Sequence, residues 1–161
     1  MAREAGFTKW CMDRLDEFKA VNKNIRAMAF FHMPPREFKE AYEKMKLGDR
    51  SVIYCHGSIG EKDGYFGISN REGHFFEEAV KNGVIKWMFC GHDHLNTLSL
   101  IYKGIQLTYG MSIDCLGYRG IDRQHVQRGG TLITLKCDGT VDINMVPLTS
   151  VVSTRVRGKK R

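Results

Sequence analysis

The stretch Val84-Ile85-Lys86-Trp87-Met88-Phe89-Cys90 is followed at once by Gly91-His92-Asp93-His94. A short, strongly apolar run bounded by glycines is typical of a strand buried in a sheet. Open α/β sheets bind ligands in crevices outside the carboxyl ends of their strands. This stretch therefore predicts both a central strand and the place where a functional site is expected.

A second apolar run, Ile25 to Phe31, predicts another buried strand, which Pro34-Pro35 ends. Helices are expected beside these two strands, because apolar residues recur there at spacings of three and four and capping residues flank them. We expect them over roughly 9–22 after a Thr8 N-cap, from Pro35 to about Met45, and from a capping box at Ser69–Glu72 to Asn82-Gly83.

The character of the chain changes after His94. Leu98–Tyr102 and Ile105–Tyr109 flank the turn pair Lys103-Gly104, which indicates a hairpin. Asp138-Gly139 separates two further strand-like runs, Thr131–Lys136 and Val141–Val146, and one more short strand is expected at Val52–Cys55. The order of elements predicts a layered α/β domain with antiparallel strands toward its C-terminal end.

The chain has 161 residues and a net charge of 25 − 18 = +7. With 42% apolar and 27% charged residues, it is not expected to be disordered, collagen-like or a coiled coil. Residues 155–161 hold five positive charges and no acid, so the rest is close to neutral, with 20 basic and 18 acidic residues. We expect a domain over residues 1–150 and a basic flexible tail over residues 151–161.

The sequence favours a cytoplasmic protein. The longest apolar stretch, Ile25 to Met33, is too short and too interrupted to span a membrane, and no signal peptide is recognisable. The five cysteines are an odd number, widely spread and without a C-x-x-C pair, which favours reduced thiols over a disulfide framework.

Three histidines follow the two predicted central strands. His92 and His94 come directly after Cys90, and His32 comes after the first strand. If these strands lie side by side, all three imidazoles converge on one edge of the sheet, where they would suit Zn, Fe, Mn or Ni. Asp93 could orient one of the rings as a hydrogen-bond acceptor, or it could face away.

The motifs Phe-Phe-His-Met-Pro-Pro (30–35) and Gly-His-Asp-His (91–94) resemble the last two metal-binding blocks of the calcineurin-like metallophosphoesterases, close to the purple acid phosphatase-related group. The resemblance covers roughly residues 7–148. It implies the C-terminal half of a layered α-β-β-α sandwich, with antiparallel hairpins.

The resemblance also implies a phosphoesterase that hydrolyses phosphate esters with a hydroxide activated by two metal ions, drawn from Fe, Mn or Zn. In the family pattern, the positions of His32 and His92 bind one metal, and that of His94 binds the other. The family's earlier blocks, D-x-H, G-D-x-x-D and G-N-H-[DE], are absent, and Gly48-Asp49-Arg50 stands in the wrong order to replace one.

Three neutral imidazoles cannot hold two divalent ions without a bridging carboxylate, because the repulsion between the ions is uncompensated. The isolated chain is therefore expected to be inactive, its catalytic residues are unknown, and its expected partner is an N-terminal half of the domain, in cis or in trans. A fragment of a complete phosphatase, a half that assembles with a separate polypeptide and a degenerate homologue are all compatible with this pattern; the first is favoured.

Other interpretations stay open. Cys90, His92 and His94 could together bind a single structural zinc ion, although their spacing is tight for a closed site. A non-catalytic module could use the basic tail on nucleic acid or an acidic membrane; the tail lacks aromatic residues, so nucleic acid is not the expected partner.

Further residues gave weaker signals. Cys55-His56 resembles a nucleophile pair, but neighbouring residues on a strand point to opposite faces. The long loops could contribute to a substrate pocket, whereas two of the remaining histidines are expected to be solvated. The loop residues are Glu61, Asp63, Tyr118 and Arg119, and the two histidines are His74 and His125.

Overall fold

The computed structural model describes residues 2–68, 73–119, 121 and 128–151. It contains helices and strands in an alternating order, followed by two hairpins. The helices are α1 (Ala2–Val21), α2 (Glu37–Lys46), α3 (Phe75–Asn82) and α4 (Leu148–Val151), with a short 3-10 turn at Lys62–Gly64; the strands are β1 (Ala27–Phe30), β2 (Val52–His56), β3 (Ile85–Cys90), β4 (Ser99–Tyr102), β5 (Ile105–Tyr109), β6 (Gly129–Leu135) and β7 (Val141–Pro147).

A five-stranded mixed sheet forms the centre of the fold, with the strand order β1-β3-β5-β4-β2. Strands β1, β3 and β5 run parallel to one another, while β4 is antiparallel to both β5 and β2. The chain is thus mixed α/β, and β1 and β3 lie side by side, which is the condition under which the sequence predicts that the histidines after them converge. The carboxyl ends of three parallel strands meet at one edge of this sheet.

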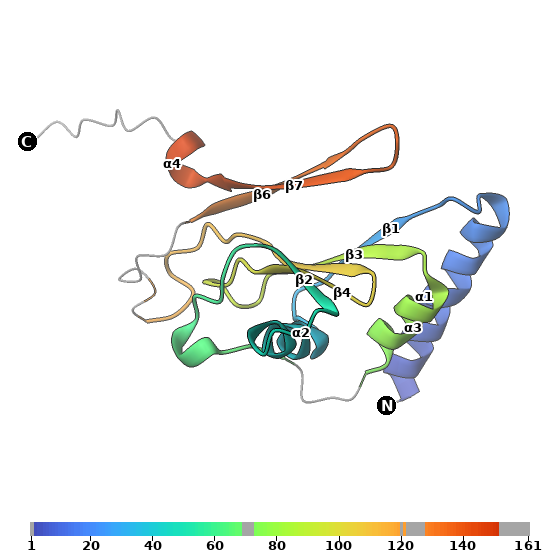
Figure 1. The fold of residues 1–161 in the computed structure, drawn as a ribbon, viewed down its shortest axis with the longest axis horizontal. Helices are drawn as coiled ribbons and strands as arrows, with labels where there is room; N and C mark the ends of the chain where they lie inside the picture. The colour runs from blue at the N-terminus through green and yellow to red at the C-terminus, as the bar shows by residue number, and fades with distance from the viewer. Residues whose placement is uncertain (1, 69–72, 120, 122–127, 152–161) are drawn as a thin grey trace, which may run out of the picture.

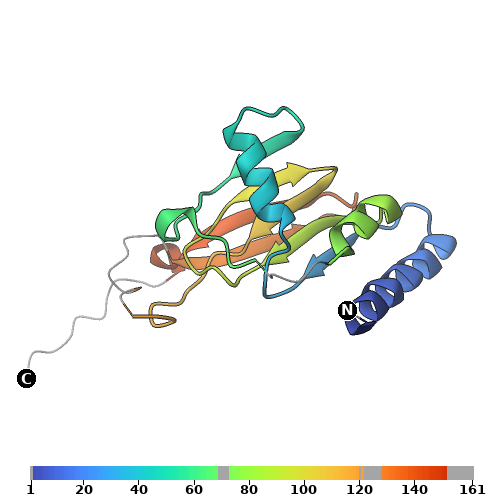
Figure 2. The ribbon, with the colours of Figure 1, turned by 90° about the horizontal axis from the view of Figure 1, so that it is seen from below.

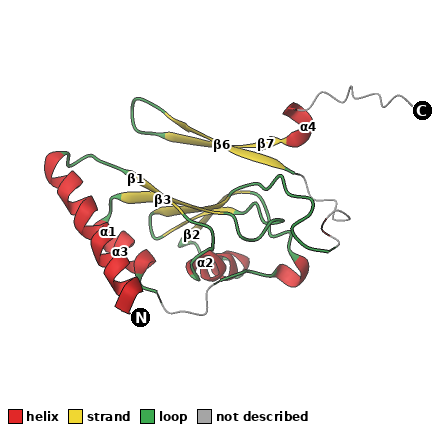
Figure 3. Cartoon of the chain, turned by 180° about the vertical axis from the view of Figure 1, so that it is seen from behind, coloured by secondary structure: helices red, strands yellow, loops and turns green. Residues whose placement is uncertain are grey.

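The elements form layers around the sheet. Figure 1 shows the β6–β7 hairpin over one face and α2 against the other, and the view from behind in Figure 3 shows the same order. Helices α1 and α3 lie together toward the β1 end of the sheet, as Figure 2 shows from below. The side-chain amide of Asn82 joins these two helices by donating to Asp16 Oδ1 at 2.6 Å.

The hydrophobic core lies between the sheet and the helices. Phe38 of α2 and Phe76 of α3 are each 1% exposed and pack against the buried side chains of the sheet strands. The ring of Phe38 meets that of Tyr109 edge to face, with centroids 5.2 Å apart. The apolar periodicity of the two helices therefore faces the sheet, as expected for amphipathic helices that cover it.

The hairpins follow the turn chemistry in the sequence. Lys103 and Gly104 both have positive φ, at 49° and 78°, which suits a tight turn between antiparallel strands. Strands β4 and β5 pair across this turn, and β6 pairs with β7 to form the separate two-stranded sheet. Both predicted hairpins are confirmed.

Several predicted helix boundaries differ from the structure. The first helix begins at Ala2, so Thr8 lies inside it as a buried residue and is not the N-cap. Helix α3 begins at Phe75 after His74, whereas the predicted capping box at 69–72 lies outside the described residues. The same helix ends as predicted, because Gly83 follows it with a φ of 76°.

No helix within the described part of the chain is long and apolar enough to cross a membrane. The basic residues 155–161 lie outside the described residues, as does His125.

Candidate metal centre

His32 and His92 meet because they follow neighbouring parallel strands, β1 and β3. Their backbones are joined directly: the carbonyl oxygen of His32 accepts hydrogen bonds from Gly91 N at 3.1 Å and from His92 N at 2.9 Å. One residue earlier, Phe31 N donates to the carbonyl of Phe89. The two loops are therefore fixed against each other at the point where the imidazoles leave them.

The two rings lie edge to face, and His32 Nε2 is 3.1 Å from His92 Nδ1. Two imidazole nitrogens bound to one ion, each at about 2.0–2.1 Å, lie about 2.9–3.4 Å apart when the angle at the ion is roughly 90–110°. The observed separation falls within that range. The distance is that of a hydrogen bond between the two rings, and it is also compatible with two ligands of one ion.

His94 has a different neighbour. Its Nδ1 lies 2.6 Å from Asp114 Oδ2, in the loop that follows β5. A hydrogen bond from the backbone of Leu116, followed by the contact with His94, lowers the pKa of Asp114 below its ordinary value. Because this contact uses Nδ1, Nε2 is the nitrogen through which His94 can bind a ligand.

Asp93 is buried, and its carboxylate is hydrogen-bonded within the fold. Its side chain is 3% exposed, and its carboxylate accepts hydrogen bonds from Gly67 N and from the hydroxyl of Tyr109, which lies 2.6 Å away. Of the two roles left open by the sequence, these contacts favour the one in which Asp93 faces away from the imidazoles. A role in orienting a ring stays a prediction.

Gly67 also determines how closely a second loop approaches the histidines. A Cβ atom built on Gly67 would overlap Cδ2 of His92 and would lie 2.6 Å from Asp93 Oδ1. The absence of a side chain at this position therefore lets the backbone lie against both residues.

Side-chain hydrogen bonds of Asn96 and Glu61 link residues 60–65 to the segment that follows His94. The Asn96 side chain, fully buried, accepts from Gly60 N and Glu61 N and donates to the carbonyl of Tyr65. Glu61 Oε1 in turn accepts from Leu95 N at 3.0 Å. These hydrogen bonds hold the segment around Glu61 against Leu95 and Asn96, which directly follow His94.

Tyr118 contacts the same glutamate. Its hydroxyl donates to Glu61 Oε2 at 2.8 Å, and its ring centroid is 6.4 Å from that of His94. Partial burial and the neighbouring Glu61 raise the pKa of Tyr118 to about 12. Asp63, by contrast, lines a different cavity, beside α2, of about 530 Å³.

Asp114 is the site residue that the sequence interpretation missed. The available signal was its position: it follows β5, the third parallel strand, whose carboxyl end lies at the same edge as those of β1 and β3. The predicted hairpin of β4 and β5 gave no indication that β5 also pairs with β3, so the contact of Asp114 with His94 was not predicted, although Tyr118 and Arg119 of the same loop were named as possible pocket residues.

The structure gives little support to the two alternative sites, a structural zinc site at Cys90 and a nucleophile pair at Cys55-His56. Burial, together with the charge of Asp93, raises the pKa of the Cys90 thiol above its ordinary value. Burial also raises the pKa of Cys55. Both ring nitrogens of the adjacent His56 are buried and lack hydrogen-bond partners among the described residues, so no Cys–His pair activates a thiol there.

Within residues 2–68, 73–119, 121 and 128–151, no three His, Cys, Asp or Glu side chains converge as a metal site. The structure brings His32 and His92 together and places His94 on Asp114, but these residues do not form a full ligand set by themselves.

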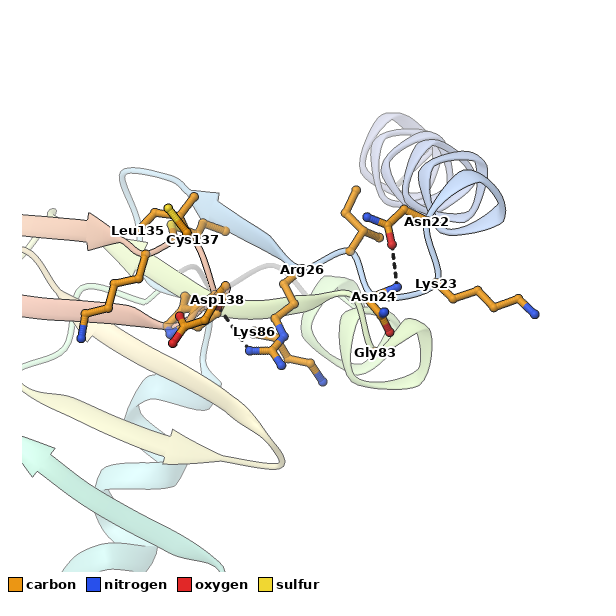
Figure 4. Close-up of a pocket in the computed structure, with 14 residues that line it drawn as sticks. Asn22, Lys23, Asn24, Arg26, Gly83, Lys86, Leu135, Cys137 and Asp138 are labelled. Carbon is orange, nitrogen blue, oxygen red and sulfur yellow. Dashed lines mark hydrogen bonds between the residues drawn. The ribbon is translucent and has the colours of Figure 1, made fainter.

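A larger cavity of about 880 Å³ lies elsewhere, between the segment that joins α1 to β1 and the tip of the β6–β7 hairpin (Figure 4). Arg26 and Lys86 line it, and Arg26 donates to the carbonyl of Gly139 at 3.3 Å. Lys136, a further cationic lining residue, pairs with Asp142. None of the three candidate histidines lines this cavity.

No protein-family model, curated protein or solved structure matches this chain. The resemblance to calcineurin-like phosphoesterases therefore rests on the sequence motifs alone.

Proposed function

We propose that this chain supplies the C-terminal metal-binding blocks of a metal-dependent phosphoesterase. The observation that carries the proposal is the 3.1 Å separation of His32 Nε2 and His92 Nδ1 at the carboxyl ends of adjacent parallel strands. This is the edge at which α/β sheets bind ligands, and the spacing suits two ligands of one ion.

The three histidines of this chain would contribute ligands to two different ions. His32 and His92 would bind the first ion, and His94 would bind the second through Nε2. Ions of Fe, Mn or Zn would neutralise charge on the phosphoryl oxygens of a phosphate ester and activate water for hydrolysis. Tyr118 and Glu61 would form one side of the substrate pocket, because their hydrogen bond lies beside His94.

The remaining ligands would come from another polypeptide segment that continues the sheet, in cis or in trans. Two observations support this part of the proposal. Among the described residues β1 pairs only with β3, so it forms an edge of the sheet where a further strand can pair, and its Phe30 is 64% exposed. An apolar groove of about 400 Å³ runs beside it, lined among others by Phe7, Cys11 and Met33.

In this arrangement the β6–β7 hairpin would belong to the second sheet of an α-β-β-α sandwich. Its position over the face opposite α2 agrees with that role (Figure 1). The added segment would supply the bridging carboxylate that three imidazoles lack.

The experiment is hydrolysis of p-nitrophenyl phosphate by the chain joined to, or co-expressed with, a segment that carries the three missing blocks. With Mn²⁺ or Fe²⁺ added, we expect turnover by the assembled protein and none by the chain alone. His92→Ala should abolish turnover, whereas His74→Ala, an exposed histidine at the start of α3, should leave it unchanged. Metal-dependent turnover that persists in His92→Ala would overturn the ligand assignment.

A further inference from the structure

We infer that Asp114 is a positioning residue that fixes the tautomer of His94, so that Nε2 rather than Nδ1 faces the bound ligand. The part of this inference that concerns metal rests on the proposed function. The part that concerns the tautomer depends only on the contact between the two side chains.

The contact is short and specific. Asp114 Oδ2 lies 2.6 Å from His94 Nδ1, and the sequence separates the two residues by 20 positions. An ionised carboxylate can only accept hydrogen bonds, and a neutral imidazole carries its proton on one nitrogen. Nδ1 therefore holds the proton, and the lone pair is on Nε2.

The carboxylate of Asp114 is itself held in place. Its Oδ1 accepts from Leu116 N at 2.8 Å, and its backbone N–H donates to Ser112 Oγ at 3.0 Å. The carbonyl of Asp114 accepts from Arg128 Nε at 2.7 Å, and Arg128 is only 8% exposed. The acceptor is thus fixed on a loop that a buried guanidinium anchors.

Gly117 packs against the other side of the His94–Asp114 pair. A Cβ atom at this position would overlap Asp114 Oδ2 and would lie 2.6 Å from both Cε1 and Nδ1 of His94. The loop backbone consequently packs against the imidazole and the carboxylate together, which restricts rotation of the ring.

The two histidines of the Gly-His-Asp-His motif then present opposite nitrogens. His92 directs Nδ1 toward His32, whereas the carboxylate of Asp114 occupies Nδ1 of His94. Carboxylates that hold the second nitrogen of a metal-binding imidazole fix its orientation and raise its basicity. Asp114 would have that function for His94.

The test is the tautomer of His94, read from long-range ¹H–¹⁵N correlation spectra of the labelled chain above pH 8. We expect the Nδ1–H form in the wild type. Asp114→Asn is close in shape, but its amide can donate to Nδ1, so we expect a shift toward the Nε2–H form. Asp114→Ala, which removes the acceptor, should shift it in the same direction. The tautomer of His74 in the same spectra is the control, because this residue is exposed and remote in sequence from Asp114.

Zn²⁺ titrated into the same samples provides the second measurement, followed at the Hε1 signal of His94. The midpoint should rise about 10–100-fold in Asp114→Asn. An unchanged Nδ1–H form in both variants would overturn the inference; a changed tautomer with an unchanged Zn²⁺ midpoint would overturn the part that concerns metal binding. If Zn²⁺ leaves His32, His92 and His94 unperturbed in the wild type, the proposed function fails, and the tautomer alone decides whether Asp114 positions the ring.

Discussion

Removing one hydroxyl group, in Tyr109→Phe, tests how the loop that carries His92 and His94 is held. The side chain of Tyr109 is fully buried, and its hydroxyl donates to Asp93 Oδ2 at 2.6 Å. Burial and the neighbouring carboxylate raise the pKa of this hydroxyl, so it remains a donor at neutral pH. The substitution leaves the ring, and its contact with Phe38, in place.

The expected loss follows from the chemistry of that hydrogen bond. A hydrogen bond to a charged group contributes about 1.5–3 kcal/mol, and a buried carboxylate that loses a partner is poorly compensated. Asp93 would keep the hydrogen bonds from Gly67 N but lose the one from Tyr109. We therefore expect the free energy of unfolding to fall by about 1.5–3 kcal/mol.

The assay is urea denaturation at neutral pH, with the wild type, Tyr109→Phe and the control Tyr118→Phe. The control removes a hydroxyl that also bonds a carboxylate, Glu61, but from a side chain that is 44% exposed. It should change the free energy of unfolding by no more than about 0.5 kcal/mol. Equal losses in the two variants, or a loss in Tyr109→Phe no greater than the control's, would refute the reasoning.

Two further substitutions probe neighbouring features. Gly67→Ala would force a Cβ against His92 and Asp93, so the free energy of unfolding should fall by about 1–3 kcal/mol and the NMR signals of the His92 ring should move. The control is Gly6→Ala in α1. The new Cβ has no neighbouring atom within 4 Å there, so this substitution should leave the free energy of unfolding unchanged or raise it slightly. Burial lowers the pKa of His56, so the folded state binds fewer protons than the unfolded state, and stability should fall as the pH drops below about 6.5. Replacing this unpartnered ring, in His56→Leu, should raise the melting temperature and flatten its dependence on pH over that range, which thermal melts between pH 5 and pH 8 would measure. A melting temperature that still falls equally steeply with pH in His56→Leu would count against this assignment.

Local chemistry explains which parts of the fold were predictable. The apolar runs around Met28 and Met88 both form strands, but only the second is buried: β1 lies at the edge of the sheet, so the expectation of a buried first strand was wrong. The turn pair Lys103-Gly104 adopts the positive φ angles that a tight hairpin requires. Gly83 ends α3 for the same conformational reason. These features depend on a few neighbouring residues, so the sequence alone is enough to predict them.

The order of the strands depends on contacts between distant residues, and here the prediction was incomplete. Strand β5 pairs with β3 on one side and with β4 on the other, which places the loop after Tyr109 beside His94. Hairpin signals identify only the β4 side of β5. The partnership of His94 with Asp114 follows from that crossover, and no local pattern indicates it.

In the candidate site, too, features set by neighbouring residues were predictable and those set by distant contacts were not. The sequence predicted that all three imidazoles converge if the two strands lie side by side; β1 and β3 do pair, and His32 and His92 meet, but His94 contacts Asp114 instead. The direction of Asp93 was not predictable, because the choice between facing the imidazoles and facing the core depends on Gly67 and Tyr109, which are 26 and 16 residues away.

Calorimetric titration with Zn²⁺ is the decisive test of the proposal that His32 and His92 hold one metal ion together. We expect the wild-type chain to bind Zn²⁺, His32→Ala and His92→Ala each to weaken binding by more than about 100-fold, and His74→Ala to leave it unchanged. Wild-type affinity in both His32→Ala and His92→Ala would refute this ligand assignment.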